Sequence, residues 1–346
     1  MGNRPKKNVT IYDIAKAANV SPATVSRVLT GNARVSEEKK KLIMEQIEMY
    51  DFKPNALARG LSVNKSFTIG FIVPDIKNQY FSTVYYEFEK YALKNNYTAL
   101  VANSQSNYER ESQLLNMFLE KRVDGIVLMG GRVDTNSCDK KYYEEIEEIN
   151  KIAPVVITSK NENIKVPTVY LDEEQSIYDL VSHLKSQNCS SVGLLCGYDD
   201  INVSFIRRKQ FREACKFYGL EMRPEWIVDG DFSIEGGIKA MTKLSQCLKV
   251  PDAVCCINDM VAAGALNYAH TNNIDVPGDI LITGIDGSYI CEAAYPQITT
   301  IQVDYEFFAR KVCQMLIDSI NQTCSKTEIP SKTKVIVRGS TRRILK

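Results

Sequence analysis

Residues 9–32, VTIYDIAKAANVSPATVSRVLTGN, carry the pattern that decides the fold of the amino-terminal part. Apolar side chains recur there at helical spacing until Asn19, where a tight turn favours a residue that tolerates left-handed backbone. Ser21 and Pro22 suit the cap and first residue of a second helix, which we expect to end at Leu29. The stretch therefore predicts a helix-turn-helix, a unit that presents its second helix to a DNA major groove.

A third helix is expected from the cap Ser36 to about Tyr50. We expect its apolar side chains, among them Leu42, Ile43, Ile47 and Tyr50, to close a small core with the first two helices. The three helices would then form one compact domain.

A short helix is also expected over residues 56–61, within a polar linker. A helix of this length is marginal alone and forms only when it is docked. Its apolar Leu57 and Leu61 are suited to a partner helix or to an unstacked base step in DNA.

The net charge of +1 conceals a difference between two parts of the chain. Residues 1–65 hold 12 Lys or Arg against 6 Asp or Glu, whereas the remainder holds 31 against 36. This asymmetry favours a polyanionic partner for the amino-terminal part, with a solvated charged surface as the alternative.

From Ser66 onward, β-rich runs alternate with helical patterns, which predicts parallel, doubly wound sheets. One series of strands is expected at 68–73, 98–102 and 125–129. A second series begins near Thr168 and includes 192–196, 226–229, 253–257 and 280–284. We therefore expect two similar lobes, with a ligand cleft at the carboxyl ends of their strands.

Composition and motifs exclude several classes of protein. No apolar run is long enough to span a membrane, and the amino terminus lacks the pattern of a secretory signal, so a cytoplasmic protein is expected. The ten cysteines form no Cys-x-x-Cys pair, and only His183 and His270 are available to complete a metal site. Without a Walker, Gly-x-Gly-x-x-Gly or Gly-x-Ser-x-Gly motif, neither an enzyme nor a cofactor is expected.

Three stretches resemble the lactose-repressor (LacI/GalR) family of transcription regulators: residues 9–32, FKPNALARGL (52–61) and IGFIVPDIKNQYFS (69–82). Later stretches resemble landmarks of the same family in the same order: VDGIVLMG, GDFSIEGG, INDMVAAGAL, ITGIDG, PQITTIQVD and VIVRGST. General features also fit its catabolite-control branch. The resemblance implies an α/β two-lobed core of the periplasmic-binding-protein type, in which the chain crosses between the lobes three times.

These observations predict three segments. They are a helix-turn-helix DNA-binding domain (1–53), a hinge (54–65) and an effector-binding and dimerisation core (66–346). Within the core we place an N-lobe at about 66–166 and 299–328 and a C-lobe at about 167–298 and 329–346. Because the chain ends at VRGSTRRILK without a heptad segment, we expect a homodimer rather than a tetramer.

The family resemblance implies that two heads occupy successive major grooves of a pseudo-palindromic operator in double-stranded DNA. Arg27 matches a base-reading arginine, and neutralisation of a phosphate is its alternative role. Leu61 matches the leucine that wedges into the central base step, with packing against the core as the alternative. Pro22 and Ala23 can touch a thymine methyl but cannot hydrogen-bond a base edge. The remaining DNA-binding candidates, several of which could equally be caps or surface residues, are Thr10, Tyr12, Ser21, Thr24, Ser26, Asn32, Asn55, Ala58 and Arg59.

A small-molecule effector, a sugar or a sugar derivative, is expected between the lobes. The resemblance places Arg207 and Asp286 in the cleft, where ligand contact is favoured over the alternative of an interlobe salt bridge. Strand-end positions complete the set with Asn78, Tyr80, Phe81, Phe232 and Asn258. Each phenyl ring could instead belong to the core. Asp259 is expected to cap the helix beginning at Met260 rather than to touch the effector.

Two departures from the family pattern bear on the effector. Gly287 stands where relatives commonly have a second acidic residue, and Arg132 follows a strand where sugar-binding relatives can have an acidic one. Together with Arg207, Arg208 and Lys209, Arg132 favours an anionic effector such as an acidic or phosphorylated sugar. The alternative is that the side chain of Arg132 points into solvent.

Three other functions compete with a small-molecule-controlled regulator. An exported sugar-binding protein would share the core but would need a signal peptide and would lack the basic head. An α/β enzyme is compatible with the fold but has no motif in its favour. A regulator controlled by a phosphocarrier protein would keep the DNA-binding head and replace the small-molecule effector.

Overall fold

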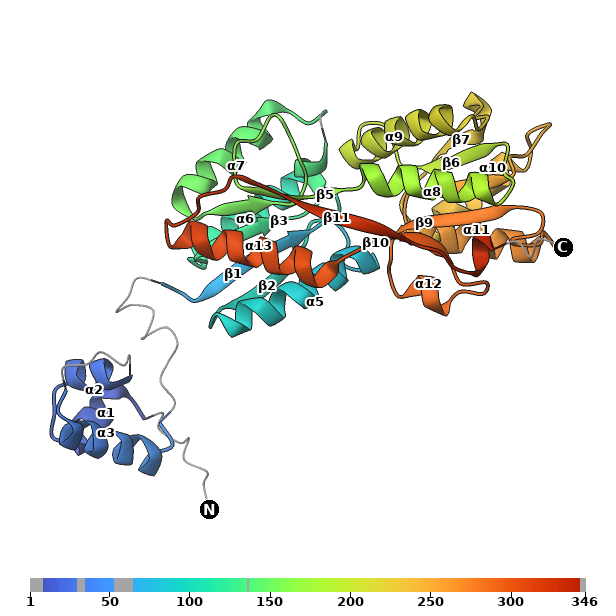
Figure 1. The fold of residues 1–346 in the computed structure, drawn as a ribbon. Coiled ribbons are helices and arrows are strands. Elements are labelled where there is room, and N and C mark those ends of the chain that lie inside the picture. Colours follow the sequence, from blue (N-terminus) through green and yellow to red (C-terminus); the bar gives the residue numbers. More distant parts are fainter. Residues whose placement is uncertain (1–8, 30–34, 53–64, 136, 343–346) are drawn as a thin grey trace, which may run out of the picture. The chain divides into compact units, whose positions relative to one another are not determined.

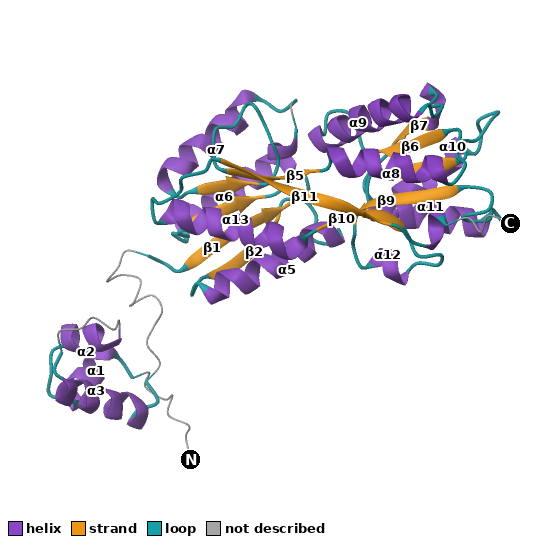
Figure 2. Ribbon diagram, in the orientation of Figure 1, coloured by secondary structure: helices purple, strands orange, loops and turns teal. Residues whose placement is uncertain are grey.

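The computed structural model describes residues 9–29, 35–52, 65–135 and 137–342, drawn as coloured ribbon in Figure 1. Contacts between Cα atoms divide the chain into two compact units, Met1–Phe67 and Thr68–Lys346. The first unit is helical, and the second is built from a mostly parallel sheet with helices on its faces (Figure 2).

Helix caps and one left-handed residue set the helix-turn-helix. Helix α1 (Ile11–Ala17) begins with a capping box, in which Thr10 Oγ1 accepts from the amide of Asp13 and the Asp13 carboxylate accepts from the amide of Thr10. Asn19 has a φ of +50° and turns the chain, as the sequence predicts. Before α2 (Pro22–Leu29), Ser21 Oγ accepts from the amide of Thr24 at 3.2 Å.

The core of this unit differs in part from the sequence prediction. Ile43 on α3 (Glu37–Met49) is fully buried, but Leu42 and Tyr50 are each 44% exposed, so their assignment to the core is wrong. Ser36 occupies the cap position of α3, although its side chain makes no capping hydrogen bond. The buried apolar side chains that meet here are Ile14, Ala15, Ala18, Val25, Ile43 and Phe52.

The N-lobe contains the strands β1 (Thr68–Val73), β2 (Thr98–Asn103), β3 (Gly125–Leu128), β4 (Val155–Ile157) and β5 (Thr168–Asp172). They pair in the order β2-β1-β3-β4-β5, all parallel. Because both faces of the sheet bury apolar side chains, the helices pack on both, as a doubly wound sheet requires. Its helices are α5 (Gln79–Lys94), α6 (Tyr108–Glu120), the 3₁₀ turn η1 (Gly131–Asp134), α7 (Lys140–Ile152) and α13 (Tyr305–Ile320).

The C-lobe repeats this design with β6 (Val192–Cys196), β7 (Ile227–Asp229), β8 (Ala253–Cys256), β9 (Leu281–Asp286) and β10 (Thr299–Val303). They pair in the order β10-β9-β8-β6-β7, again in parallel. The helices of this lobe are α8 (Glu174–Ser186), α9 (Asn202–Tyr218), η2 (Pro224–Trp226), α10 (Ile234–Leu244), α11 (Asp259–Thr271), α12 (Ile290–Ala293) and η3 (Gly339–Thr341).

Strand β11 (Glu328–Ile336) joins the two sheets. Residues 328–332 pair in parallel with β5, and residues 333–336 pair antiparallel with β10. The chain thus passes between lobes after β5, after β10 and within β11, as Figure 1 shows. The lobe boundaries predicted at residues 167 and 299 need correction, because β5 pairs inside the N-lobe sheet and β10 inside the C-lobe sheet.

No helix in the part of the chain that the structure describes is long and apolar enough to cross a membrane.

Candidate functional site

The outer face of α2 presents polar and small side chains. Ala23 and Arg27 are exposed, while Val25 between them is fully buried and fixes the orientation of the helix on the bundle. Tyr12 on α1 is 71% exposed. Pro22, Thr24 and Ser26 are half-buried on the same unit.

Two of the DNA-binding candidates have local roles as well. Thr10 and Ser21 cap the first two helices through their hydroxyl groups and are nevertheless exposed. A capping hydroxyl at a helix start remains accessible to a phosphate oxygen, so neither role excludes the other. The candidates Asn32, Asn55, Ala58, Arg59 and Leu61, and with them the predicted hinge helix, lie outside the described residues.

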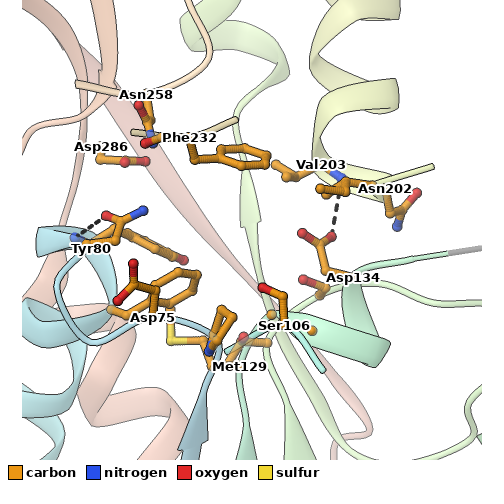
Figure 3. A pocket seen from close by; sticks show the side chains of 18 of the residues that line it. Asp75, Tyr80, Ser106, Met129, Asp134, Asn202, Val203, Phe232, Asn258 and Asp286 are labelled. Atoms are coloured by element: carbon orange, nitrogen blue, oxygen red, sulfur yellow. Dashed lines mark hydrogen bonds between the residues drawn. The ribbon is translucent and has the colours of Figure 1, made fainter. Parts of the chain in front are cut away.

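A cleft of about 810 Å³ opens between the two lobes. Seven of the eight predicted effector residues line it: Asn78, Tyr80, Phe81, Arg207, Phe232, Asn258 and Asp286. Figure 3 shows Asp286 and Asn258 toward one end of this view and Asp134 with Asn202 toward the other. Phe81 and Phe232 both line the cleft and pack against the lobe cores, so each ring combines the two roles that the sequence left open.

The cleft floor consists of Arg207 and the three carboxyl residues Asp134, Glu173 and Asp286. The guanidinium of Arg207 donates two hydrogen bonds to the carboxylate of Glu173, at 2.7 and 2.6 Å, and a third to the carbonyl of Ile257 at 2.7 Å. Asp286 lies farther away, with Oδ1 at 3.7 Å from Arg207 Nη2. Glu173 therefore holds the arginine in place, while Asp286 interacts with it only through charge.

Asp286 is buried and conformationally strained at the end of β9. It is 5% exposed and has a φ of +115°, a value that residues with a side chain rarely adopt. Burial raises its pKa well above the usual range, and the neighbouring carboxyls of Asp259 and Glu173 raise it further, against the lowering effect of Arg207. A strained, desolvated carboxyl in a cleft is typical of a ligand-binding position.

The local backbone explains why glycine follows Asp286. Gly287 has a φ of +71°, and a Cβ atom there would lie 2.5–2.8 Å from atoms of Gln302, including its Cα. An acidic residue at this position would be both strained and in collision. The family departure noted at Gly287 thus follows from the local backbone.

Asp134 on η1 links the lobes across the cleft. Its carboxyl accepts from the amide of Val203 at 3.2 Å, at the start of α9, which has no capping side chain of its own. Nearby, Thr135 Oγ1 donates to the carbonyl of Asp200, and Asn202 Nδ2 donates to the carbonyl of Lys160. These contacts hold the start of α9 against the N-lobe, on the same helix that carries Arg207.

Replacing Asp134 by Asn is expected to flatten the pH dependence of core stability. Burial raises the pKa of Asp134 from 3.8 to about 7, so the folded protein favours the neutral carboxyl. The stability that the neutral Asp134 carboxyl contributes is complete below the ordinary pKa of 3.8 and is lost as pH rises through about 7. The side-chain amide of Asn in the variant does not titrate.

Thermal unfolding of both proteins between about pH 5 and pH 8 measures this difference. The midpoint of the native protein should fall more steeply with pH than that of Asp134→Asn. The control Glu235→Gln, at an exposed carboxyl of the same cleft, should follow the native protein. Parallel curves for native protein and Asp134→Asn would contradict the assignment.

Two asparagines that line the cleft are helix caps. Asn78 Oδ1 accepts from the amide of Tyr80 at the start of α5, and Asn258 Oδ1 accepts from the amide of Val261 at the start of α11. The expected cap Asp259 is instead the first residue of α11, fully buried, and accepts from Ser288 and Thr300. The prediction that Asp259 caps this helix was therefore wrong, because the cap position lies one residue earlier.

The assignment of Arg132 to the effector site is also wrong. Its side chain is fully buried against α6 and α7 and is not part of the cleft lining. Its guanidinium pairs with Glu111 at 2.7 Å and with Glu145 at 2.5 Å, and donates to the carbonyls of Tyr108 and Tyr142. The alternative position in solvent is excluded by the same burial.

The basis for an anionic effector is weakened accordingly. Arg208 pairs with Asp199 and Asp229, and neither Arg208 nor the exposed Lys209 lines the cleft. Of the four basic residues that suggested an anion, only Arg207 remains, and Glu173 already neutralises it.

Sequence reasoning missed two residues of the floor, Glu173 and Asp134. Glu173 directly follows β5, so the rule that selected other strand-end residues also applies to it. Asp134 lies on a 3₁₀ turn after β3, whose position the sequence does not predict.

Comparison with known proteins agrees with this division into head and core. Residues 10–55 match the model described as "Bacterial regulatory proteins, lacI family", and residues 181–341 match the "Periplasmic binding protein-like domain". The chain is 35% identical over 297 residues to catabolite control protein A of Priestia megaterium, covering 85% of this chain and 87% of that protein.

Two further similarities cover nearly the whole chain. Identity to the NTD biosynthesis operon regulator NtdR of Bacillus subtilis (strain 168) is 31% over 335 residues, or 96% of this chain and 99% of that protein. The fold is similar, with a TM-score of 0.86 and 21% identity, to a lac repressor dimer bound to operator and the anti-inducer ONPF. That similarity covers 97% of this chain and 100% of the other.

Proposed function

This chain belongs to the lacI family of bacterial regulatory proteins, which are DNA-binding transcription regulators, and we propose that it represses transcription under the control of a sugar-like effector. The observation that supports this proposal is the presence, in one chain, of a helix-turn-helix and an interlobe cleft lined by aromatic and polar side chains. DNA binding belongs to the first unit and effector binding to the second.

Two copies of the chain bind one pseudo-palindromic operator. Each α2 helix lies in a major groove, where Arg27 contacts a base and the small side chain of Ala23 allows close approach. A lac repressor with a similar fold binds its operator as a dimer. The exposed position of Arg27 and the buried anchor Val25 support this arrangement.

The effector acts through the angle between the lobes. Arg207 and Asp286 face the cleft from the C-lobe, and Asp134 from the N-lobe contacts the start of the helix that carries Arg207. A ligand that touches both lobes favours one degree of closure over another. The change in the N-lobes of the dimer then alters the spacing of the heads on DNA.

Operator selection from a random duplex library tests the proposal with the full-length chain at low salt. We expect enrichment of a palindromic site with two half-sites, bound at least ~1000-fold more tightly than random competitor. Absence of any preference for a palindromic duplex, in the presence and absence of candidate effectors, would refute the proposed function.

A further inference from the structure

The lining of the interlobe cleft is predominantly acidic. Among the described residues it contains seven Asp or Glu but only three basic residues, Lys77, Lys160 and Arg207. Lys77 is exposed, and Lys160 is already placed over the ring of Tyr170. The cleft therefore offers little free positive charge to a ligand.

The excess of carboxyls is greatest around Arg207. Three carboxyls, those of Asp134, Glu173 and Asp286, act on the single guanidinium of Arg207. Glu173 takes two of its hydrogen bonds and the carbonyl of Ile257 takes the third. The charges of Arg207 and Glu173 thus cancel each other. Among the residues described, the carboxyls of Asp134 and Asp286 remain without a cation of their own.

Neither of the remaining carboxyls has a cation within hydrogen-bonding distance in the described part of the chain. Asp286 is no nearer than 3.7 Å to Arg207, and within the described ranges no ion pair involves Asp134. Burial raises the pKa of both groups, to about 7 for Asp134, because removal of water disfavours the ionised carboxylate more than Arg207 stabilises it. A hydroxyl group can donate a hydrogen bond to such a carboxyl but does not balance its charge.

Other groups in the cleft suit the same kind of ligand. The side-chain oxygen of Gln210 is buried without a hydrogen-bond donor among the residues that the structure describes. The rings of Tyr80, Phe81, Tyr108 and Phe232 also line the cleft, and aromatic faces attract cations as well as the apolar face of a sugar. The volume of about 810 Å³ is within the range of sites for drug-sized ligands.

We propose that the effector is a hydroxylated amine of the amino-sugar class, whose ammonium groups pair with the carboxyls of Asp134 and Asp286. This inference rests on the proposed function, in which the cleft is the effector site. An ammonium group supplies the positive charge that the floor lacks and hydrogen-bond donors for acceptors such as the side-chain oxygen of Gln210. A phosphorylated or acidic sugar would instead place negative charge beside carboxyls whose ionised forms burial already disfavours.

The test compares matched pairs of neutral and amino sugars on the full-length chain by calorimetry and by thermal unfolding at constant ionic strength. The pairs are glucose and glucosamine, galactose and galactosamine, mannose and mannosamine, and cellobiose with the β-1,4 disaccharide of glucosamine. We expect at least one amine to raise the unfolding midpoint and to bind about tenfold or more tightly than its neutral partner. N-acetylation of that amine, which removes the charge, should abolish the gain.

Three variants assign the preference to named carboxyls. Asp134→Asn and Asp286→Asn should each reduce the ratio of amine to neutral affinity by about tenfold. Glu213→Gln, at an exposed carboxyl of α9 outside the cleft lining, should leave the ratio unchanged. Unfolding of each variant without ligand establishes that it is folded.

Several results would overturn the inference. They are equal or tighter binding of the neutral sugars, tighter binding of a phosphorylated sugar such as glucose 6-phosphate, absence of binding by every amine tested, or an unchanged preference in both Asn variants. Operator binding is measured on the same preparation, so that failure of the proposed function is recognised separately. A chain that binds its operator but no amine refutes only the effector class.

Discussion

Replacing Arg27 by Ala is expected to lower the affinity for the selected operator by about 5- to 150-fold, the equivalent of the ~1–3 kcal/mol of one bidentate contact with guanine. Arg27 is exposed on α2, and the buried Val25 holds that face of the helix outward. Because its side chain is not part of the small core of the head, the substitution should leave folding intact. Fluorescence anisotropy with operator and with random duplex measures both affinities.

The matched control is Arg27→Lys, which keeps the charge but cannot form the two parallel hydrogen bonds of a guanidinium. If Arg27 reads a base, the Arg27→Lys variant should bind random DNA as the native protein does but should lack its preference for the operator. If Lys restores both equally, and the Ala variant weakens operator and random duplex alike, Arg27 only neutralises a phosphate.

Replacing Arg207 by Leu is expected to destabilise the core by ~3–5 kcal/mol, because it leaves the buried carboxyls of Glu173 and Asp286 without their cation. Both carboxyls are at most 7% exposed, so water cannot compensate them. Urea unfolding followed by the fluorescence of Trp226 reports the change. This residue is the single tryptophan of the chain and is fully buried in the C-lobe.

Arg208→Leu is the matched control one residue later on α9. Its partners Asp199 and Asp229 have side chains that are 60% and 49% exposed, so they regain water when the arginine is removed. We expect a loss of about 1 kcal/mol or less of ion-pair energy there. Equal destabilisation by the two substitutions would contradict the argument that the Arg207 cluster is specifically short of positive charge.

The cleft was predictable as a location, but the chemistry of its floor was not. Strand-end positions identified Asn78, Phe232 and Asp286 because parallel strands bring their carboxyl ends to one edge. The same rule does not say which basic residue pairs with which acid. Arg132 and Arg207 are both basic residues that follow strands in the sequence, yet Arg132 pairs with Glu111 on α6 and Glu145 on α7, whereas Arg207 lines the cleft.

Two predictions, those for Asp259 and Leu42, were wrong by one residue for a similar reason. Asn258 and Asp259 are both good helix caps by residue type, and Leu42 and Ile43 are both apolar. One residue is a rotation of about 100° around a helix, which places Ile43 and not Leu42 inward, and that rotation depends on packing against the other helices. Control by a phosphocarrier protein stays a prediction from the sequence, as do the DNA contacts of the hinge.

The sequence by itself determined the helix-turn-helix, the alternation of strands and helices, and the family. The first two follow from spacing and caps within about twenty residues, which local backbone physics governs. The family follows from the resemblance of motifs along the whole chain. Only the tertiary structure decided the charge of the cleft, the exclusion of Arg132 and the pairing of Arg207 with Glu173. Each of these depends on the distance between side chains remote in the sequence, and on how much water the surrounding fold removes from them.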